Sequence, residues 1–467
     1  MEASIPEQVI QPLLLASDSS HSLDECLQFL IEASKTDSGR SDLASKADIL
    51  PSILALLQLL PYPSSRHHLN LSLKVLRNLC AGETRNQEAF VDHNGSLVIS
   101  ELLDSAIGDA ETVRFGLQVL ANVVVMGENR QRDVWLRFFP ERFLAIAKVR
   151  RLETCDPLCM ILYVCFDGSS EIASQLSSDD GLNIIAETMR AVGSVEYYWL
   201  KLLVSRLCVE GDCFPGLFSK LANHKDSTFT SDHAFLLSMV SDIVNERLKE
   251  VSIPKDTAHF VLGLLSQSVQ VFDFASAETS ELPTGSAVID VMGYSLVVIR
   301  DACAGGSIEE LKNDSSGGNV DMLLSSGLIE LLLDLLRKLE PPTTIKKALK
   351  QSPSSGKPCP YRGFRRDIVA VIGNCAYRRK EVQDEIRERD GLFLMLQQCV
   401  TDDENPFLRE WGLWCVRNLL EGNEENQKVV AELEMQGSVD VPQLREIGLR
   451  VEIDPLTSRP KLVNDTT

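Results

Sequence analysis

A short motif recurs along the chain at a spacing that indicates a repeat protein. Asn78 and Asn122 are 44 residues apart, and Asn374 and Asn418 are separated by the same 44 residues. Each asparagine is followed nine residues later by a glutamine, and these are Gln87, Gln131, Gln383 and Gln427. A fixed period of this length indicates one structural unit copied along the chain rather than one globular core.

The residues around the asparagines repeat as well. Residues 76–82 read LRNLCAG, residues 299–305 read IRDACAG and residues 416–422 read VRNLLEG, so that Asp301 replaces Asn in the second copy. Between these segments a glycine recurs before apolar residues at helical spacing, as in residues 327–336. Units of about 40–47 residues built from such helices are typical of HEAT and armadillo arrays. We therefore predict an all-α, armadillo/HEAT-like, right-handed superhelical solenoid.

Length and composition agree with this prediction. A chain of 467 residues exceeds what a single hydrophobic core organises. Hydrophobic residues make up 44% of the chain, but aromatic residues make up only 6%. A core supplied mainly by Leu and Val suits stacked helices better than a β-sandwich, which favours β-branched and aromatic residues.

The net charge of −21 limits the classes of partner. An acidic surface repels phosphate backbones and anionic lipid, so we expect neither nucleic acid nor a membrane as partner. The longest apolar stretch, residues 49–60, is interrupted by Pro51 and is shorter than the roughly 20 residues of a membrane span. With no basic leader before Lys35, we expect a cytoplasmic protein without an integral membrane segment. A nuclear or cytoskeleton-associated pool is compatible with this.

The sequence predicts neither a metal site nor catalysis. The twelve cysteines are mostly scattered singly, and the close pairs at 155/159 and 208/213 lack a second pair at zinc-site spacing. There is no phosphate-binding glycine loop, no G-x-S-x-G elbow and no H-E-x-x-H helix. We therefore expect no metal, no cofactor and no enzymatic activity.

Composition divides the chain into five regions. Residues 1–303 are expected to form degenerate N-terminal armadillo-like repeats, and residues 304–320, rich in Gly and Ser, a loop. Residues 321–340 are expected to form a repeat helix, residues 341–361 a flexible basic Pro/Ser insertion, and residues 362–467 a C-terminal armadillo domain and tail. Within the tail, residues 449–454 alternate apolar and charged side chains and a turn follows, which predicts a short β-hairpin with residues 461–463.

In a stacked helical array, the helix that carries the repeated asparagine is expected to line an extended concave surface. Trp414 and Asn418 are four residues apart and therefore share one helix face. This matches the W-x-x-x-N pattern of peptide-gripping armadillo grooves, although Lys74, Gln118 and Ala370 replace the Trp in the other copies. The candidate groove residues are Asn78, Asn122, Asp301, Asn374, Trp411, Trp414, Arg417 and Asn418.

A structural role for the same residues is an open alternative. Each asparagine lies about one turn before an expected helix end, where its amide can satisfy a free carbonyl or form a bridge to the matched glutamine. Large aromatic residues such as Trp411 and Trp414 also occur more often in cores than in binding sites.

The last hundred residues are similar to a known family. They include residues 364–384 (FRRDIVAVIGNCAYRRKEVQD), residues 402–411 (DDENPFLREW) and residues 417–423 (RNLLEGN), followed by Asn426-Gln427. This block, about residues 362–463, resembles the C-terminal domain of the ataxin-10 family. The resemblance implies a cytoplasmic armadillo protein without catalysis, linked through its partners to cytokinesis and to cell growth and development. It also makes Phe364 to Asn426 the expected shared contact surface.

Three functions are compatible with the sequence. The first is a protein–protein interaction scaffold, for which self-association also remains open. The second is a transport-receptor-like binder of basic peptides, suggested by the negative charge and by Trp414 and Asn418. The third is an enzyme whose residues meet only on folding, and a deep pocket lined by titratable residues would be its sign.

Overall fold

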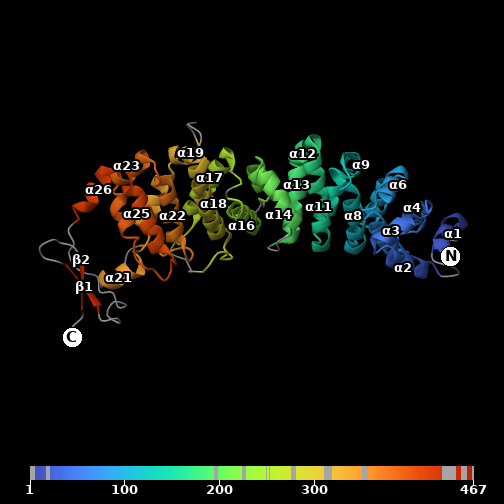
Figure 1. The fold of residues 1–467 in the computed structure, drawn as a ribbon, viewed down its shortest axis with the longest axis horizontal. Coiled ribbons are helices and arrows are strands. Elements are labelled where there is room, and N and C mark those ends of the chain that lie inside the picture. Colours follow the sequence, from blue (N-terminus) through green and yellow to red (C-terminus); the bar gives the residue numbers. More distant parts are fainter. Residues whose placement is uncertain are drawn as a thin grey trace. The chain divides into compact units, whose positions relative to one another are not determined.

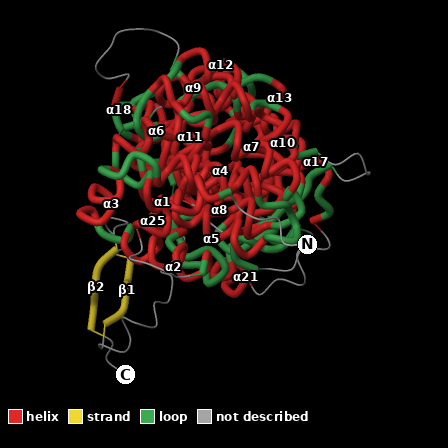
Figure 2. The backbone as a smooth tube through the Cα atoms, turned by 90° about the vertical axis from the view of Figure 1, so that its right-hand side faces the viewer, coloured by secondary structure: helices red, strands yellow, loops and turns green. Residues whose placement is uncertain are grey.

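The computed structural model describes residues 6–16, 22–193, 198–222, 228–248, 250–251, 253–274, 280–309, 318–349, 356–433, 449–453 and 460–464. Within these ranges the chain is helical apart from one two-stranded sheet, seen in yellow in Figure 2. It divides into two compact units, one of residues 1–272 and 283–302 and one of residues 273–282 and 303–467. The predicted all-α solenoid class is confirmed.

The first unit holds most of the helices. They are α1 (Glu7–Ala16), α2 (Leu23–Ala33), α3 (Asp37–Ala44), α4 (Ile49–Leu59), α5 (Arg66–Leu79), α6 (Thr84–Asp92), α7 (Gly95–Ser105), α8 (Ala110–Val124), α9 (Glu128–Phe138), α10 (Glu141–Lys148), α11 (Leu152–Gly168), α12 (Ser170–Leu176), α13 (Asp179–Val192), α14 (Tyr198–Val204), the π-helical turn η1 (Ser205–Val209), α15 (Phe214–Lys220), α16 (Ser231–Glu246) and α17 (Lys255–Val271). The long helix α18 (Ala287–Glu309) belongs to the first unit up to residue 302.

The second unit contains the remaining elements. They are α19 (Asn319–Ser325), α20 (Leu328–Lys338), α21 (Thr343–Leu349), α22 (Phe364–Ala376), α23 (Lys380–Glu388), α24 (Gly391–Leu396), α25 (Leu408–Leu420), α26 (Glu424–Ala431), and the strands β1 (Leu449–Ile453) and β2 (Pro460–Asn464).

The repeat is a set of three helices, as armadillo repeats require. One set is α6, α7 and α8, and the next is α9, α10 and α11. The third helices stack directly, so that α5 packs on α8 and α8 on α11, while α22 packs on α25 in the second unit (Figure 1). These helices bury Leu, Val and Ile on the faces that meet, which joins the repeats into one continuous core within each unit.

The repeated asparagines join one repeat to the one before it. Asn122 Nδ2 donates to the carbonyl of Arg77 at 2.7 Å, and Asn418 Nδ2 donates to the carbonyl of Gly373 at 2.9 Å. Both carbonyls lie in the last turn of the preceding third helix, where the helix itself offers no donor. These amides therefore cap the neighbouring repeat. Asn78 does the same for α2 through the carbonyl of Ile31, at 3.4 Å.

The matched glutamines cap their own repeat. Gln87 Nε2 donates to the carbonyl of Cys80 at 2.7 Å, and Gln383 Nε2 to that of Ala376 at 3.2 Å, both at the end of a third helix. Gln87 also donates to the backbone carbonyl of Asn122 at 3.0 Å. The expected bridge between the Asn and Gln side chains of one repeat is thus replaced by two side-chain-to-backbone caps.

The structure differs from what was expected for residues 304–320 and for residues 321–340. Helix α18 continues to Glu309, several residues into the segment expected to be a loop, because two glycines cost only about 1 kcal/mol each in a helix that is already formed. Residues 310–317 of that segment lie outside the described residues. The single helix expected at 321–340 is two helices, α19 and α20, because Gly327 adopts a left-handed φ of 84° between them.

The insertion at 341–361 is not a loop throughout. It contains α21, and Thr343 Oγ1 donates to Asp402 Oδ1 at 3.0 Å. At its far end Tyr361 is buried and donates through its hydroxyl to Asp367 Oδ2 at 2.9 Å. Residues 350–355 lie outside the described residues. Prolines suggested an extended segment, whereas Thr343 bonds to a residue distant in sequence and Tyr361 bonds to the first turn of α22.

The predicted hairpin at the C-terminal tail is present. Strands β1 and β2 pair antiparallel, with Val451 opposite Leu462 (Figure 2). The cysteines also behave as expected, because all twelve are free and most are buried. Among the described helices, none is long and apolar enough to cross a membrane.

The glutamine cap can be tested by replacing Gln87 with Leu. Its side chain is fully buried and pairs two carbonyls, so Gln87→Leu should lower the free energy of unfolding by about 2–3 kcal/mol. Gln427→Leu is the matched control, because Gln427 is exposed and makes one such bond, to Leu420, and it should lose less than about 1 kcal/mol. Urea unfolding measures both, and equal losses would contradict the capping role.

His233 predicts a pH dependence of the first unit. Burial lowers the pKa of His233 below its ordinary value of 6.5. Its Nδ1 accepts the backbone N–H of Thr230 at 3.1 Å, and its Nε2 lies 2.9 Å from the carbonyl of Phe218, so the folded state favours the neutral ring. The unfolded chain therefore binds the proton more readily, and stability should fall as the pH drops below about 6.5.

The His233→Gln variant cannot take up that proton, so its thermal midpoint should depend less on pH over the same interval. Melting curves of the two proteins across a pH series provide the measurement. An equally steep decline for His233→Gln would assign the effect to other groups.

Candidate functional site

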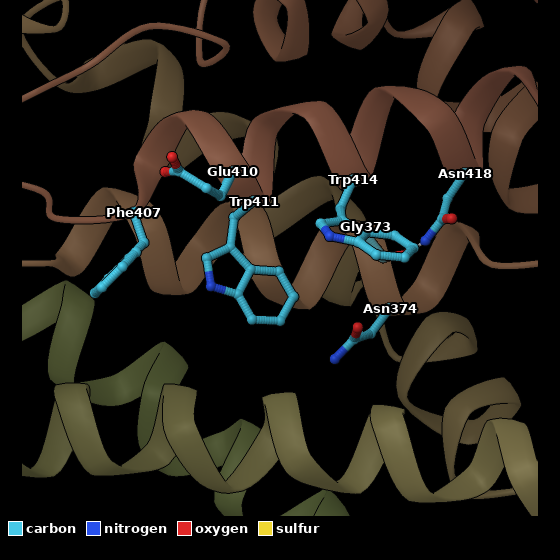
Figure 3. Close-up of a pocket in the computed structure, with 7 residues that line it drawn as sticks. All are labelled: Gly373, Asn374, Phe407, Glu410, Trp411, Trp414 and Asn418. Atoms are coloured by element: carbon cyan, nitrogen blue, oxygen red, sulfur yellow. Dashed lines mark hydrogen bonds between the residues drawn. The ribbon is translucent and has the colours of Figure 1, made fainter.

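A cavity of the second unit lies between α22 and α25. Its volume is about 330 Å³, and it is lined by Gly373, Asn374, Phe407, Glu410, Trp411, Trp414 and Asn418 (Figure 3). We call this cavity the aromatic pocket. It brings together Asn374, Trp411, Trp414 and Asn418, four of the residues that the sequence singled out.

One face of α25 supplies the aromatic wall. Phe407, Trp411, Trp414 and Asn418 follow one another at spacings of four, three and four residues, which places them on the same side of a helix. Figure 3 shows them in this order along the helix, with Asn374 of α22 facing Trp414 from the other side. The sequence interpretation found the Trp414–Asn418 pair but missed Phe407, although the same spacing rule applies to it.

The floor of the pocket is the last turn of α22. Gly373 has no side chain to fill the space, and a Cβ atom there would lie only 3.3 Å from Cα and Cβ of Cys415. The two helices therefore approach closely at this point. Asn418, which is 8% exposed, fixes the contact by capping the Gly373 carbonyl. Neither the glycine nor Glu410 was singled out from the sequence, since a floor becomes visible only when two helices are packed.

The start of α25 is held in a strained conformation. Phe407 immediately precedes the helix and adopts a left-handed φ of 63°, which costs a non-glycine residue roughly 1–2 kcal/mol. One turn later Gly412 is required, because a Cβ atom there would lie 2.6 Å from the carbonyl oxygen of Gln398. Together these residues fix where the aromatic face begins.

A buried arginine anchors the loop that leads into α25. Arg365 is 3% exposed, and its backbone N–H donates to Asn405 Oδ1 at 2.9 Å. Its guanidinium donates to Gln398 Oε1 at 3.1 Å and also to the backbone carbonyl of Glu340. Burial lowers the pKa of Arg365, and these acceptors keep the charged group in place. Arg365 thus ties α22 to the segment that follows α20 and to the loop between α24 and α25.

The pocket is apolar and open to solvent. Phe407 is 68% exposed and Trp414 is 55% exposed, which is unusual for such large apolar side chains. Arg417 stacks on Trp414, with its Cζ 5.0 Å from the ring centroid. At the rim, Glu410 is paired with the neighbouring Arg409 at 3.2 Å. The carboxylate of Glu410 is therefore neutralised by its neighbour, and aromatic side chains make up most of the pocket wall.

The remaining candidate residues lie in the first unit and do not contribute to the pocket. Asn78 and Asn122 act as the caps described above. Asp301 is 4% exposed and forms an ion pair with Arg300 at 2.7 Å. In the described ranges, no group of three or more His, Cys, Asp or Glu side chains is placed to hold a metal ion.

Comparison with known proteins places this pocket in a defined domain. A sequence model described as the spinocerebellar ataxia type 10 protein domain matches residues 364–462, which include both α22 and α25. Ataxin-10 of Bos taurus is 28% identical over 412 residues, covering 84% of this chain and 82% of that protein. The chain is therefore similar to ataxin-10 proteins over most of its length, and its residues 364–462 match their characteristic domain. The resemblance noted in the sequence is confirmed.

Two further ataxin-10 proteins show how the similarity is distributed. Ataxin-10 of Homo sapiens is 27% identical over 402 residues, covering 81% of this chain and 78% of that protein. The ataxin-10 homolog of Dictyostelium discoideum is 36% identical over 92 residues, which are 20% of this chain and 15% of that protein.

Similar solved structures are engineered helical-repeat proteins. One engineered protein covers 89% of this chain and 99% of its own, with a TM-score of 0.35 and 13% identity. A designed armadillo repeat protein, solved in complex with a (KR)4 peptide, covers 51% of this chain and 99% of its own, with a TM-score of 0.33 and 16% identity.

The pocket residues should separate into those that hold the fold and those that do not. Asn418→Leu leaves the Gly373 carbonyl without its cap and should lower the free energy of unfolding by about 1–3 kcal/mol. Trp414→Ala removes an exposed side chain and should cost less than about 1 kcal/mol. Urea unfolding monitored by circular dichroism gives both values. A larger loss for Trp414→Ala than for Asn418→Leu would show that Trp414 is a core residue.

Proposed function

We propose that this protein is a non-enzymatic scaffold that holds partner proteins, and that the aromatic pocket is one of its docking sites. The observation that carries the proposal is the row of Phe407, Trp411 and Trp414, in which Phe407 and Trp414 are exposed, above a floor without a side chain at Gly373. Exposed aromatic clusters of this kind are typical of interaction sites, because Trp and other aromatic side chains dominate binding energy at protein interfaces.

The pocket suits an apolar side chain from an extended segment of the partner. Its volume of about 330 Å³ is at the lower end of ligand pockets, which is enough for a large anchor side chain but not for a cofactor. Trp411 and Trp414 would contact the faces of the anchor, while Phe407 lies at one end of the same row (Figure 3). The buried apolar area supplies the affinity.

A regular asparagine ladder that reads a peptide backbone receives less support. The amide groups of Asn122 and Asn418 each donate to a carbonyl of the preceding repeat. A bound peptide would have to break these caps to use the same donors. The proposed mode of binding therefore depends on aromatic contact, with the asparagines holding the helices at the correct separation.

The basic-peptide alternative also receives little support from this pocket. Its only lining carboxylate, Glu410, is paired with Arg409, and Arg417 lies over Trp414. A Lys or Arg side chain would therefore meet a cation at the pocket rather than a free carboxylate. An apolar anchor avoids this repulsion.

The test uses peptides selected from a random library on the full-length protein, with affinity measured by isothermal titration calorimetry. Trp414→Ala should weaken a pocket-binding peptide by at least about tenfold, as expected for a central aromatic residue. Leu413→Ala is the matched control, because Leu413 is 54% exposed on the same helix but does not line the pocket. Equal affinities for all three proteins would place the docking site elsewhere.

We further propose that the bound partners serve cell division, specifically cytokinesis, or cell growth and development, and that the protein acts in the cytoplasm. Similarity to ataxin-10 proteins supports this proposal. In cells depleted of the protein, re-expression of the wild type and of Leu413→Ala should restore division, whereas Trp414→Ala should leave an excess of binucleate cells. Full rescue by Trp414→Ala at equal expression would separate the pocket from this role.

A further inference from the structure

Three cations of the first unit converge on one buried aromatic ring. Lys74 Nζ lies 4.7 Å from the centroid of Phe115, Arg114 Cζ lies 4.5 Å from it, and Arg77 Cζ lies 5.9 Å from it. Lys74 and Arg77 come from α5, and Arg114 and Phe115 come from α8. We call Lys74, Arg77 and Arg114 the basic triad. It is formed by two stacked third helices.

The triad has no counter-charge. In the part of the chain that the structure describes, no carboxylate forms an ion pair with Lys74, Arg77 or Arg114, although the chain carries a net charge of −21. Several carboxylates of the first unit are engaged by other bases: Glu111 with Arg66 at 3.2 Å, Glu32 with Lys35 at 2.6 Å, and Asp167 with Arg206 at 2.7 Å. Three unneutralised cations therefore remain together in an acidic protein.

The triad is fixed in position by neutral groups. Arg77 Nη1 donates to Gln118 Oε1 at 3.1 Å, and Arg77 Nη2 donates to Asn78 Oδ1 at 3.0 Å. These amide oxygens orient the guanidinium without cancelling its charge. All three cations are half-buried, and Nε of Arg114 is buried without a hydrogen-bond partner.

The mutual repulsion of the three cations also favours a bound anion. Burial, followed by repulsion from Arg114, lowers the pKa of Arg77. The face of the Phe115 ring attracts the cations, but it carries no net charge. A bound anion would remove the repulsion between the three cations and would accept their free donors, and charge-assisted hydrogen bonds of this kind are among the strongest in proteins.

We propose that the basic triad is a binding site for an anionic side chain, a carboxylate or a phosphate, presented by an extended acidic segment of a partner protein. The triad occupies the helix face that carries Trp414 in the second unit, since Lys74 stands four residues before Asn78 as Trp414 stands before Asn418. This site is independent of the aromatic pocket and selects the opposite chemistry to a basic peptide.

A protein segment fits the triad better than nucleic acid does. A nucleic acid strand would bring a long row of phosphates against a chain of net charge −21, and three cations neutralise only a few of them. A short acidic segment needs only one or two anionic groups at the triad, and the rest of the segment can be uncharged.

The test measures fluorescence anisotropy of short labelled peptides added to the full-length protein. The probes are a peptide alternating Glu and Ser, the same peptide with phosphoserine, a Lys/Ser peptide, and a single-stranded oligonucleotide. We expect one or both anionic peptides to saturate and the Lys/Ser peptide not to bind at this site. Comparison of the two anionic peptides distinguishes carboxylate from phosphate. Affinity should fall with added salt, because the interaction is between charges.

Charge-matched variants locate the binding. Lys74→Gln with Arg114→Gln should weaken the anionic peptides by about tenfold or more. Arg85→Gln with Lys148→Gln removes the same charge from exposed positions on α6 and α10 and should change affinity by less than about twofold. Trp414→Ala should have no effect on these peptides. Circular dichroism confirms that each variant is folded.

A charge reversal provides a second measurement that does not depend on loss of binding. Lys74→Glu with Arg114→Glu should abolish binding of the anionic peptides and create binding of the Lys/Ser peptide. Equal weakening by the test and control variants would overturn the proposal, as would absence of saturable binding by both anionic peptides. Tighter binding of the oligonucleotide than of either peptide would assign the triad to nucleic acid instead.

Discussion

The fold of this protein depends on how the last turn of one helix is satisfied by its neighbours. Every third helix ends with carbonyl groups that have no donor within the helix. An asparagine from the following repeat and a glutamine from the following helix supply the missing donors, as Asn122 does for Arg77 and Gln87 for Cys80. Apolar burial brings the repeats together, but these amides fix their register. A repeat without its successor would lose both its apolar cover and part of its cap.

The same caps account for the position of the aromatic pocket. Asn418 holds the last turn of α22 against α25, and close packing at Gly373 leaves a floor without a side chain. Phe407, Trp411 and Trp414 then line the side of the pocket that α25 and the residue before it supply. Arg365 fixes the loop from which α25 starts. The pocket thus results from the way α22 and α25 pack, and aromatic residues line the space that this packing leaves.

The fold class was accessible from the sequence because the repeat is periodic. Asn78, Asn122, Asn374 and Asn418 marked the third helices correctly, and the alternating residues at 449–453 marked the hairpin. Boundaries between α18, α19 and α20 were wrong because glycine has two uses. Gly327 breaks a helix by adopting a left-handed φ, whereas the glycines at 305 and 306 stay within one, and composition does not separate these cases.

The candidate site was only partly accessible for a related reason. The spacing of Trp411, Trp414 and Asn418 is local and can be read along one helix, but Gly373 becomes part of a pocket only through the packing of α22. The basic triad also requires the packing of α5 on α8. The bond that orients Arg77 joins it to Gln118, which is 41 residues away in the sequence. Residues that act within one helix leave a pattern in the sequence, and residues that meet across a repeat boundary do not.

The position four residues before each asparagine has a consequence for how such a protein can diversify. Lys74, Gln118 and Trp414 occupy this same place in three of the copies, and each is at least partly exposed while the neighbouring asparagine holds the backbone. Exchange of one of these side chains alters what the surface selects but leaves the core untouched. A single architecture can therefore display a cation in the first unit and an indole in the second, so that specificity can change without a change of fold.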